Sequence, residues 1–231
     1  PESWWAIVFN PSFPYRLAHM VLAAFITTCF VIGGVSAWYL RRGVHVEAGK
    51  RMLKHAVAFA AIAVPLQIFV GDLHGLNVGK YQPVKRAAME AHWRSEPPGH
   101  GVPLVLFAVP NEREERNDYE IAIPKLGSLV LTHTLDGEIQ PLTAVPRDQR
   151  PPVAPVFWGF RVMVGVGMAM LLVSWWTAWR LRKNAEPTRG QALALTGMMF
   201  SGWVATLAGW YVTEIGRQPW LVTGVLRTAD A

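Results

Sequence analysis

Cysteine is almost absent from this chain of 231 residues, in which Cys29 is the single example. One cysteine excludes a disulfide framework, a thiolate zinc site and the CxxCH motif that attaches haem covalently. Charged residues are also scarce, at 16% of the chain. Ordinary soluble domains carry about 25% charged residues, so this chain does not have the composition of one.

In place of charge the chain has apolar residues, which make up 52% of it and include eleven tryptophans. This composition predicts a membrane-embedded protein. The net charge of +6 does not indicate a nucleic-acid partner, because the basic residues gather in short segments beside apolar runs. The sequence begins at Pro1 with neither an initiator methionine nor a recognisable targeting segment, so we expect it to be part of a longer polypeptide.

Four segments are long enough to cross a hydrocarbon core, which takes ~20 predominantly apolar residues. They span residues 15–40, 55–70, 154–179 and 192–215. We predict an all-α fold, namely a polytopic membrane helical bundle of four transmembrane helices with one long extramembrane loop. The second segment is the weakest, because its apolar stretch is short and contains Pro65. A membrane helix tolerates proline where a neighbouring group satisfies the freed carbonyl, and we expect a kink there.

Basic residues mark both short connections between these segments: Arg41, Arg42, Lys50, Arg51 and Lys54 in the first, and Arg180, Arg182, Lys183 and Arg189 in the second. The positive-inside rule predicts that both connections are cytoplasmic. The chain then divides into a first transmembrane hairpin (1–75), a periplasmic loop (76–150) and a second transmembrane hairpin (151–231).

This topology predicts a similar depth, near the outer face, for five unusual residues: His19, Asp72, Arg161, Met163 and Glu214. Ionisable residues inside a bilayer are costly, and by default they mark a functional site. Imidazole and thioether are a known axial ligand pair for haem iron. A carboxylate is a harder donor, suited to iron that is kept high-spin.

Four of these residues also have a simpler interpretation. His19 is equally compatible with a buried imidazole that hydrogen-bonds a backbone carbonyl, and methionine commonly fills apolar cores. Arg161 either extends its charge to the interface or pairs with a carboxylate such as a haem propionate. Glu214 is three residues from Arg217 and can form an ordinary salt bridge with it.

Four stretches carry a family resemblance: LAHM (17–20), GDLHGLNVGKYQPVKRAAMEAHW (71–93), APVFWGFRVMVGVG (154–167) and GWYVTEIGRQPW (209–220). In this order they resemble the quinol-oxidising subunit I of cytochrome bd-type oxidases, the terminal oxidases of bacterial respiratory chains. The resemblance implies that His19 and Met163 are the axial ligands of a low-spin haem b and that Glu214 is a ligand of a high-spin haem b. It also makes Trp210 an aromatic between the haems, with Arg217 offsetting charge around Glu214. Arg161 is a further candidate cofactor-binding residue, through the propionate contact named above.

The segment 76–150 resembles the quinol-binding loop of that family, in its short form that is often described as cyanide-insensitive. Lys85 and Glu90 match the positions tied there to quinol oxidation. Their roles suit the chemistry, because quinol releases protons with its electrons and a carboxylate accepts a proton while a lysine holds a quinol oxygen. On a helix their spacing turns the two side chains about 140° apart, so they would flank a ligand. Without the family, the same segment is an ordinary amphipathic surface helix.

The resemblance implies oxidation of ubiquinol or menaquinol at the periplasmic side of the bacterial inner membrane. Electrons would pass through the b haems to an oxygen-reducing haem, either haem d or a third haem b, and the reaction would contribute to the proton motive force. The implied partners are membrane lipid, oxidase subunit II and a missing N-terminal part of subunit I. We expect the chain alone to be inactive.

Three other functions fit parts of the sequence. A membrane di-haem b cytochrome without oxygen reduction would use His19 and Met163 but would not need Glu214. A secondary transporter would use the intramembrane charges but usually shows inverted repeats with broken helices. A purely structural subunit would leave the buried ionisable residues without an explanation.

Overall fold

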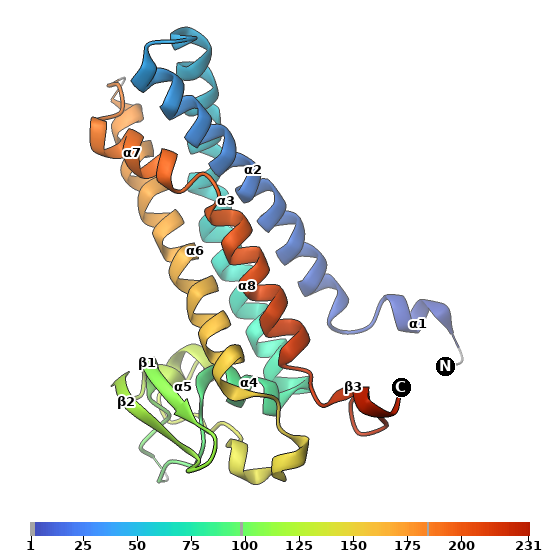
Figure 1. Ribbon diagram of the computed structural model, residues 1–231. Coiled ribbons are helices and arrows are strands. Elements are labelled where there is room, and N and C mark those ends of the chain that lie inside the picture. Colours follow the sequence, from blue (N-terminus) through green and yellow to red (C-terminus); the bar gives the residue numbers. More distant parts are fainter. Residues whose placement is uncertain (1–2, 98, 184) are drawn as a thin grey trace. The chain divides into compact units, whose positions relative to one another are not determined.

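The computed structural model describes residues 3–97, 99–183 and 185–231. Helices dominate the chain, and four spans are long and apolar enough to cross a membrane. They are α2 (Phe13–Arg42), α3 (Val46–Tyr81), α6 (Val153–Arg182) and a span over Arg189–Ile215 (Figure 1). The prediction of a polytopic helical membrane bundle is confirmed.

The remaining elements are short α-helices, the 3₁₀ helices η1 (Leu142–Ala144), η2 (Arg147–Gln149) and η3 (Thr228–Asp230), and two pairs of antiparallel strands. The sequence analysis did not predict the strands. The α-helices are α1 (Trp4–Val8), α4 (Pro83–Glu90) and α5 (Leu126–Thr132). The strands are β1 (Leu104–Asn111), β2 (Arg116–Ile123), β3 (Trp220–Val222) and β4 (Leu226–Arg227).

The chain forms two compact units. The first comprises Pro1–Gly71 and Val162–Leu207, and the second comprises Asp72–Arg161 and Ala208–Ala231. In the first unit a buried apolar cluster joins three of the long helices, with Ile26 and Phe30 from α2, Ala60, Ala63 and Val64 from α3, and Met170 from α6. This unit is therefore a helical bundle whose helices pack through small and branched side chains.

Helix α3 is the longest helix, although its segment was predicted to be the weakest span. Pro65 lies inside it and has no N–H to donate to the carbonyl of Ala61, four residues earlier. The indole Nε1 of Trp175 on α6 donates a hydrogen bond of 2.9 Å to that carbonyl. The neighbouring helix thus satisfies the group that the proline frees, which lets α3 continue through Pro65 within the apolar environment.

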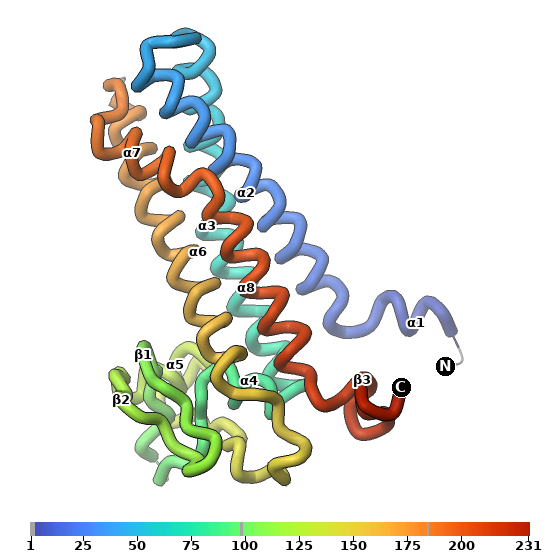
Figure 2. The backbone as a smooth tube through the Cα atoms, in the orientation of Figure 1, coloured from blue at the N-terminus to red at the C-terminus, as the bar shows by residue number. Residues whose placement is uncertain are grey.

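The fourth span is two helices rather than one. Helix α7 (Arg189–Gly197) ends and α8 (Ser201–Ile215) begins after a turn that contains no proline, as the tube in Figure 2 shows. Close packing surrounds the break: a Cβ added to Gly34 would lie 2.7 Å from Cβ of Met199, and one added to Gly202 would lie 2.7 Å from Cα of Thr27. Glycine at both positions allows α2 to approach the backbone of this span.

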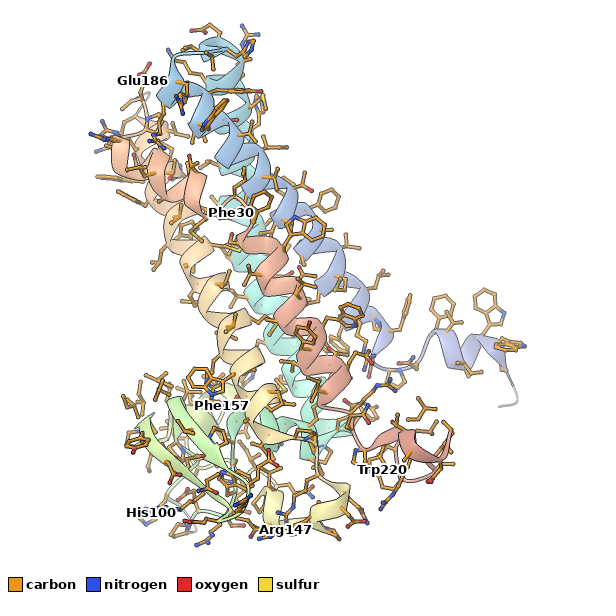
Figure 3. All side chains as sticks on the ribbon, in the orientation of Figure 1. Phe30, His100, Arg147, Phe157, Glu186 and Trp220 are labelled. Atoms are coloured by element: carbon orange, nitrogen blue, oxygen red, sulfur yellow. The ribbon has the colours of Figure 1, made fainter. Side chains whose placement is uncertain are left out.

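The two basic connections lie at the same end of the first unit, as the sequence predicted. Nζ of Lys50, in the first turns of α3, is 2.8 Å from Oε1 of Glu186, which precedes α7 (Figure 3). Thr188 then starts α7 with a capping box, in which its hydroxyl and the side chain of Gln191 satisfy each other's backbone N–H groups.

The second unit is built around the hairpin of β1 and β2, which pair from Leu104 with Ile123 to Asn111 with Arg116. The inner side of the hairpin contributes Val105 and Ala108 to a core shared with α4 and the first turns of α6. Phe157 of α6 is fully buried in this core (Figure 3).

Candidate functional site

His19 lies on the inner side of α2 in the first unit. Leu17 and Met20 beside it are about half exposed, whereas His19 is partly buried and faces Gly71 of α3. A Cβ added to Gly71 would lie 3.3 Å from Cε1 of the imidazole. Glycine therefore leaves open the flank of the ring that any side chain at this position would fill.

Met163 lies at the corresponding level of α6. It precedes Met170 by seven residues, just as His19 precedes Ile26, and both Met170 and Ile26 belong to the same buried cluster. Seven residues are two helical turns, so both side chains lie ~10 Å beyond that cluster on the sides of α2 and α6 that face it. The imidazole, the thioether and the gap beside Gly71 fit an axial pair for a planar cofactor between helices.

Lys85 and Glu90 are buried, with 6% and 2% of their surfaces exposed, in contrast to the surface-helix alternative. They lie on α4 in the second unit, and Pro83 occupies the first position of this helix. Nζ of Lys85 is 3.4 Å from the carbonyl oxygen of Thr213, and its side chain packs over Gly216 at the end of α8. The two charged side chains therefore have different surroundings, consistent with their helical spacing.

Glu90 forms an ion pair with Arg161 of α6. Nη2 of Arg161 donates to Oε2 of Glu90 over 2.6 Å, while Nε donates to the carbonyl of Val105 over 2.7 Å. The guanidinium also lies over the ring of Phe157, with 4.6 Å between its central carbon and the ring centroid. A carboxylate this deeply buried needs such a partner, because an unpaired buried charge is costly.

Trp210, Glu214 and Arg217 lie on one side of α8 and the turn that follows it. Trp210 is 61% exposed, and the side chain of Glu214 is 46% exposed. Oε2 of Glu214 accepts a hydrogen bond of 3.0 Å from Nε of Arg217, so the predicted salt bridge is present. A carboxylate that is 46% exposed can hold this partner and still offer its other oxygen to a metal, so the salt bridge is compatible with a ligand role.

Asp72 pairs with a residue that the sequence analysis did not consider. Oδ2 of Asp72, near the C-terminal end of α3, is 3.0 Å from Nε2 of His133, which follows α5. The two residues are 61 positions apart. No local pattern could have indicated this pair.

His92 is a second residue that the sequence analysis missed. It follows α4 directly, is 7% exposed and lines a cavity of about 270 Å³ together with Glu90. Burial lowers the pKa of His92, and a hydrogen bond with the backbone of Ile139 partly opposes that shift. The sequence signal was available, because this histidine lies two residues after a predicted catalytic glutamate.

Among the described residues, the structure pairs Glu90 with Arg161 and Glu214 with Arg217, and it brings His19 and Met163 to one level of the first unit. Within the described ranges it shows no group of three or more His, Cys, Asp or Glu side chains that could hold a metal ion. The fold and these residues define a polytopic membrane protein with imidazole, thioether and carboxylate donors on its helices.

The chain belongs to the family described as cytochrome bd terminal oxidase subunit I, whose family model matches residues 1–231. It is 29% identical to cytochrome bd-II ubiquinol oxidase subunit 1 of Escherichia coli (strain K12), over 97% of this chain and 56% of that protein. It is 32% identical to the putative cytochrome bd menaquinol oxidase subunit I of Bacillus subtilis (strain 168), over 98% of this chain and 52% of that protein.

A solved structure agrees with these relatives. The bd oxidase from Geobacillus thermodenitrificans is similar with a TM-score of 0.87 and 29% identity, over 98% of this chain and 52% of that chain. This chain therefore spans about half the length of the relatives that it matches. Membership in a cytochrome family implies haem cofactors and disfavours the transporter and structural-subunit alternatives.

Proposed function

We propose that this chain supplies the quinol-oxidising site and the haem b ligands of a respiratory quinol:oxygen oxidoreductase. Its family supports the class of reaction, and its relatives are named as ubiquinol and menaquinol oxidases. The observation that carries the proposal is the buried Glu90, which Arg161 holds as an ion pair beside a cavity. A fixed carboxylate that is shielded from bulk water suits a group that accepts protons from a bound substrate.

His19 and Met163 are the ligands proposed for a low-spin haem b, since both face inward at one level of the first unit. Glu214 is the ligand proposed for a high-spin haem b, with Trp210 against the cofactor and Arg217 balancing charge. The haems would supply one-electron carriers. Arg161 has more N–H donors than its bonds to protein groups use, so a propionate contact remains available to it.

Lys85 and Glu90 act on the substrate in this proposal. Lys85 donates a hydrogen bond to one quinol oxygen and thereby orients the ring, while Glu90 accepts a hydroxyl proton as electrons leave. The site would lie on the periplasmic side of the bacterial inner membrane, with the basic connections in the cytoplasm. Subunit II and the remainder of subunit I would complete the oxygen-reducing centre, with haem d or a third haem b.

The test replaces Glu90 by Gln and, separately, Lys85 by Ala in the complete oxidase. We expect quinol-dependent oxygen consumption to fall about 10²-fold or more in Glu90→Gln, because a general base is lost, while the haem spectra stay unchanged. A matched control is Glu138→Gln, which removes an exposed carboxylate of the same loop that does not line the cavity. Equal loss with quinol and with an artificial electron donor would show that these residues do not form a quinol site.

A further inference from the structure

The cavity beside Glu90 connects the interior of the second unit to its surface. Its lining runs from the buried Glu90 and His92, past Trp93, to the exposed Arg94 and Glu96. A volume of about 270 Å³ is enough for several waters, because one water occupies ~30 Å³ in the liquid. The charged and polar lining provides hydrogen-bond partners for them.

Glu90 needs such a route if it accepts protons. Only 2% of its surface is exposed, and Oε2 is held 2.6 Å from Nη2 of Arg161. A proton accepted by this carboxylate cannot pass directly to bulk water. It has to leave through the cavity that Glu90 lines.

His92 is the buried titratable side chain that lies next to Glu90 in this cavity. Its Nε2 is buried and makes no hydrogen bond with any described residue. A buried polar nitrogen without a partner carries a free-energy cost, so its presence calls for an explanation such as a functional role or an ordered water. An imidazole nitrogen with a free lone pair can accept a proton from a neighbouring acid and pass it on.

The backbone holds His92 firmly in this position. Ala91 ends α4 in the left-handed conformation, with φ 48°, and this turns the chain so that Glu90 and His92 both line the cavity. The N–H of His92 donates to the carbonyl of Ala87, and its own carbonyl accepts from the N–H of Leu142, each over 2.9 Å. These bonds fix the backbone from which the imidazole extends.

We propose that His92 is a proton relay that passes protons released by quinol oxidation from Glu90 through this cavity to the outer aqueous phase. The inference rests on the proposed function. A quinol O–H bond breaks and an O–H bond forms on Glu90, while the electron goes to the haem chain. The proton then moves, directly or through a cavity water, to Nε2 of His92 and on to bulk water. Glu90 is again anionic, and the second proton follows the same route.

The experiment uses the complete oxidase with His92→Ala, and oxygen consumption driven by short-chain ubiquinol and, in parallel, short-chain menaquinol. We expect kcat to fall about 10-fold to 100-fold with little change in KM, because proton transfer slows while binding is retained. Tetramethyl-p-phenylenediamine donates electrons without protons, so its oxidation rate should be unchanged. Millimolar imidazole should restore quinol oxidation, since it can occupy the space that the side chain leaves.

His100→Ala is the matched control, because His100 is an exposed histidine of the same loop that does not line the cavity (Figure 3). It should behave as the wild type, with and without imidazole. His92→Gln fills the site without a titratable ring, so it should lose activity and gain nothing from imidazole.

Three results would overturn the relay. One is a wild-type kcat in His92→Ala, and another is an equal loss with the phenylenediamine donor. The third is a loss that imidazole does not restore, accompanied by a lower unfolding temperature, which would make His92 a packing residue. A wild-type oxidase that oxidises neither quinol would instead refute the proposed function itself. Activity that depends on Glu90 but not on His92 would refute only the relay.

Discussion

Trp175→Phe tests how α3 accommodates Pro65. The substitution keeps an aromatic ring but removes the Nε1–H that donates to the Ala61 carbonyl over 2.9 Å. Because Trp175 is 53% exposed, the smaller ring changes buried contact area little. The carbonyl that Pro65 frees would then have no partner in an apolar environment.

The expected cost follows from this one bond. Hydrogen bonds between side chains in membrane proteins contribute about 0.6 kcal/mol on average and up to about 1.7 kcal/mol. A buried carbonyl left without a partner costs about 1–3 kcal/mol. We therefore expect Trp175→Phe to lower the free energy of unfolding by about 1–2 kcal/mol.

A double-mutant cycle with Pro65→Ala separates the hydrogen bond from the loss of ring size. Alanine at position 65 restores an N–H that can donate to Ala61, so Trp175→Phe should cost less than about 0.5 kcal/mol in that background. The measurement is equilibrium unfolding by SDS in mixed micelles. Trp203→Phe serves as the control, because this tryptophan is 57% exposed and its indole donates to no described residue. The same cost for Trp175→Phe with proline or alanine at position 65 would refute the reasoning.

Three further predictions concern the candidate site. Met163→Leu should abolish the low-spin haem b signal but reduce stability by less than about 1.5 kcal/mol, because the volumes are similar; an unchanged low-spin spectrum would contradict the ligand assignment. Arg161→Met should destabilise the second unit by about 3–5 kcal/mol, because it leaves the buried Glu90 carboxylate without its ion-pair partner. The double variant with Glu90→Gln should recover part of that loss. Proteolysis of the second unit at increasing SDS concentrations measures the stability of the single and the double variant. Glu214→Gln should deplete high-spin haem b, whereas Arg217→Gln should lower the free energy of unfolding by about 0–1 kcal/mol and keep the haem. Equal haem-to-protein ratios in the two variants would show that Glu214 is only a salt-bridge partner.

Much of the first unit could be predicted from the sequence, because a membrane span needs a continuous apolar run and a window of hydropathy detects it. The bounds of α3 could not be predicted in this way. Its last turns, from Gly71 to Tyr81, are polar and contain Gly75 and Gly79, which favour other conformations. They are helical because Val78 packs into the core of the second unit, a tertiary contact that a local pattern does not reveal.

The second unit was harder to predict for the same reason. Strand β2 carries an alternating pattern, with Tyr119, Ile121 and Ile123 on one side, and this was a detectable strand signal. The pair of Glu90 and Arg161 joins residues 71 positions apart, so the sequence supplied the two charges but not their contact. A haem propionate is the other carboxylate that the sequence analysis considers for Arg161, and that contact remains a prediction.

Arg161 of α6 is a neighbour both of the residue proposed to accept protons and, along the sequence, of the residue proposed to hold haem iron. Arg161 fixes Glu90, the residue proposed to take protons from quinol, and it lies two residues before Met163, the residue proposed to hold the iron that takes the electrons. A substitution at Arg161 should therefore alter quinol oxidation and the low-spin haem together, whereas substitutions at Glu90 and Met163 should each alter one of them.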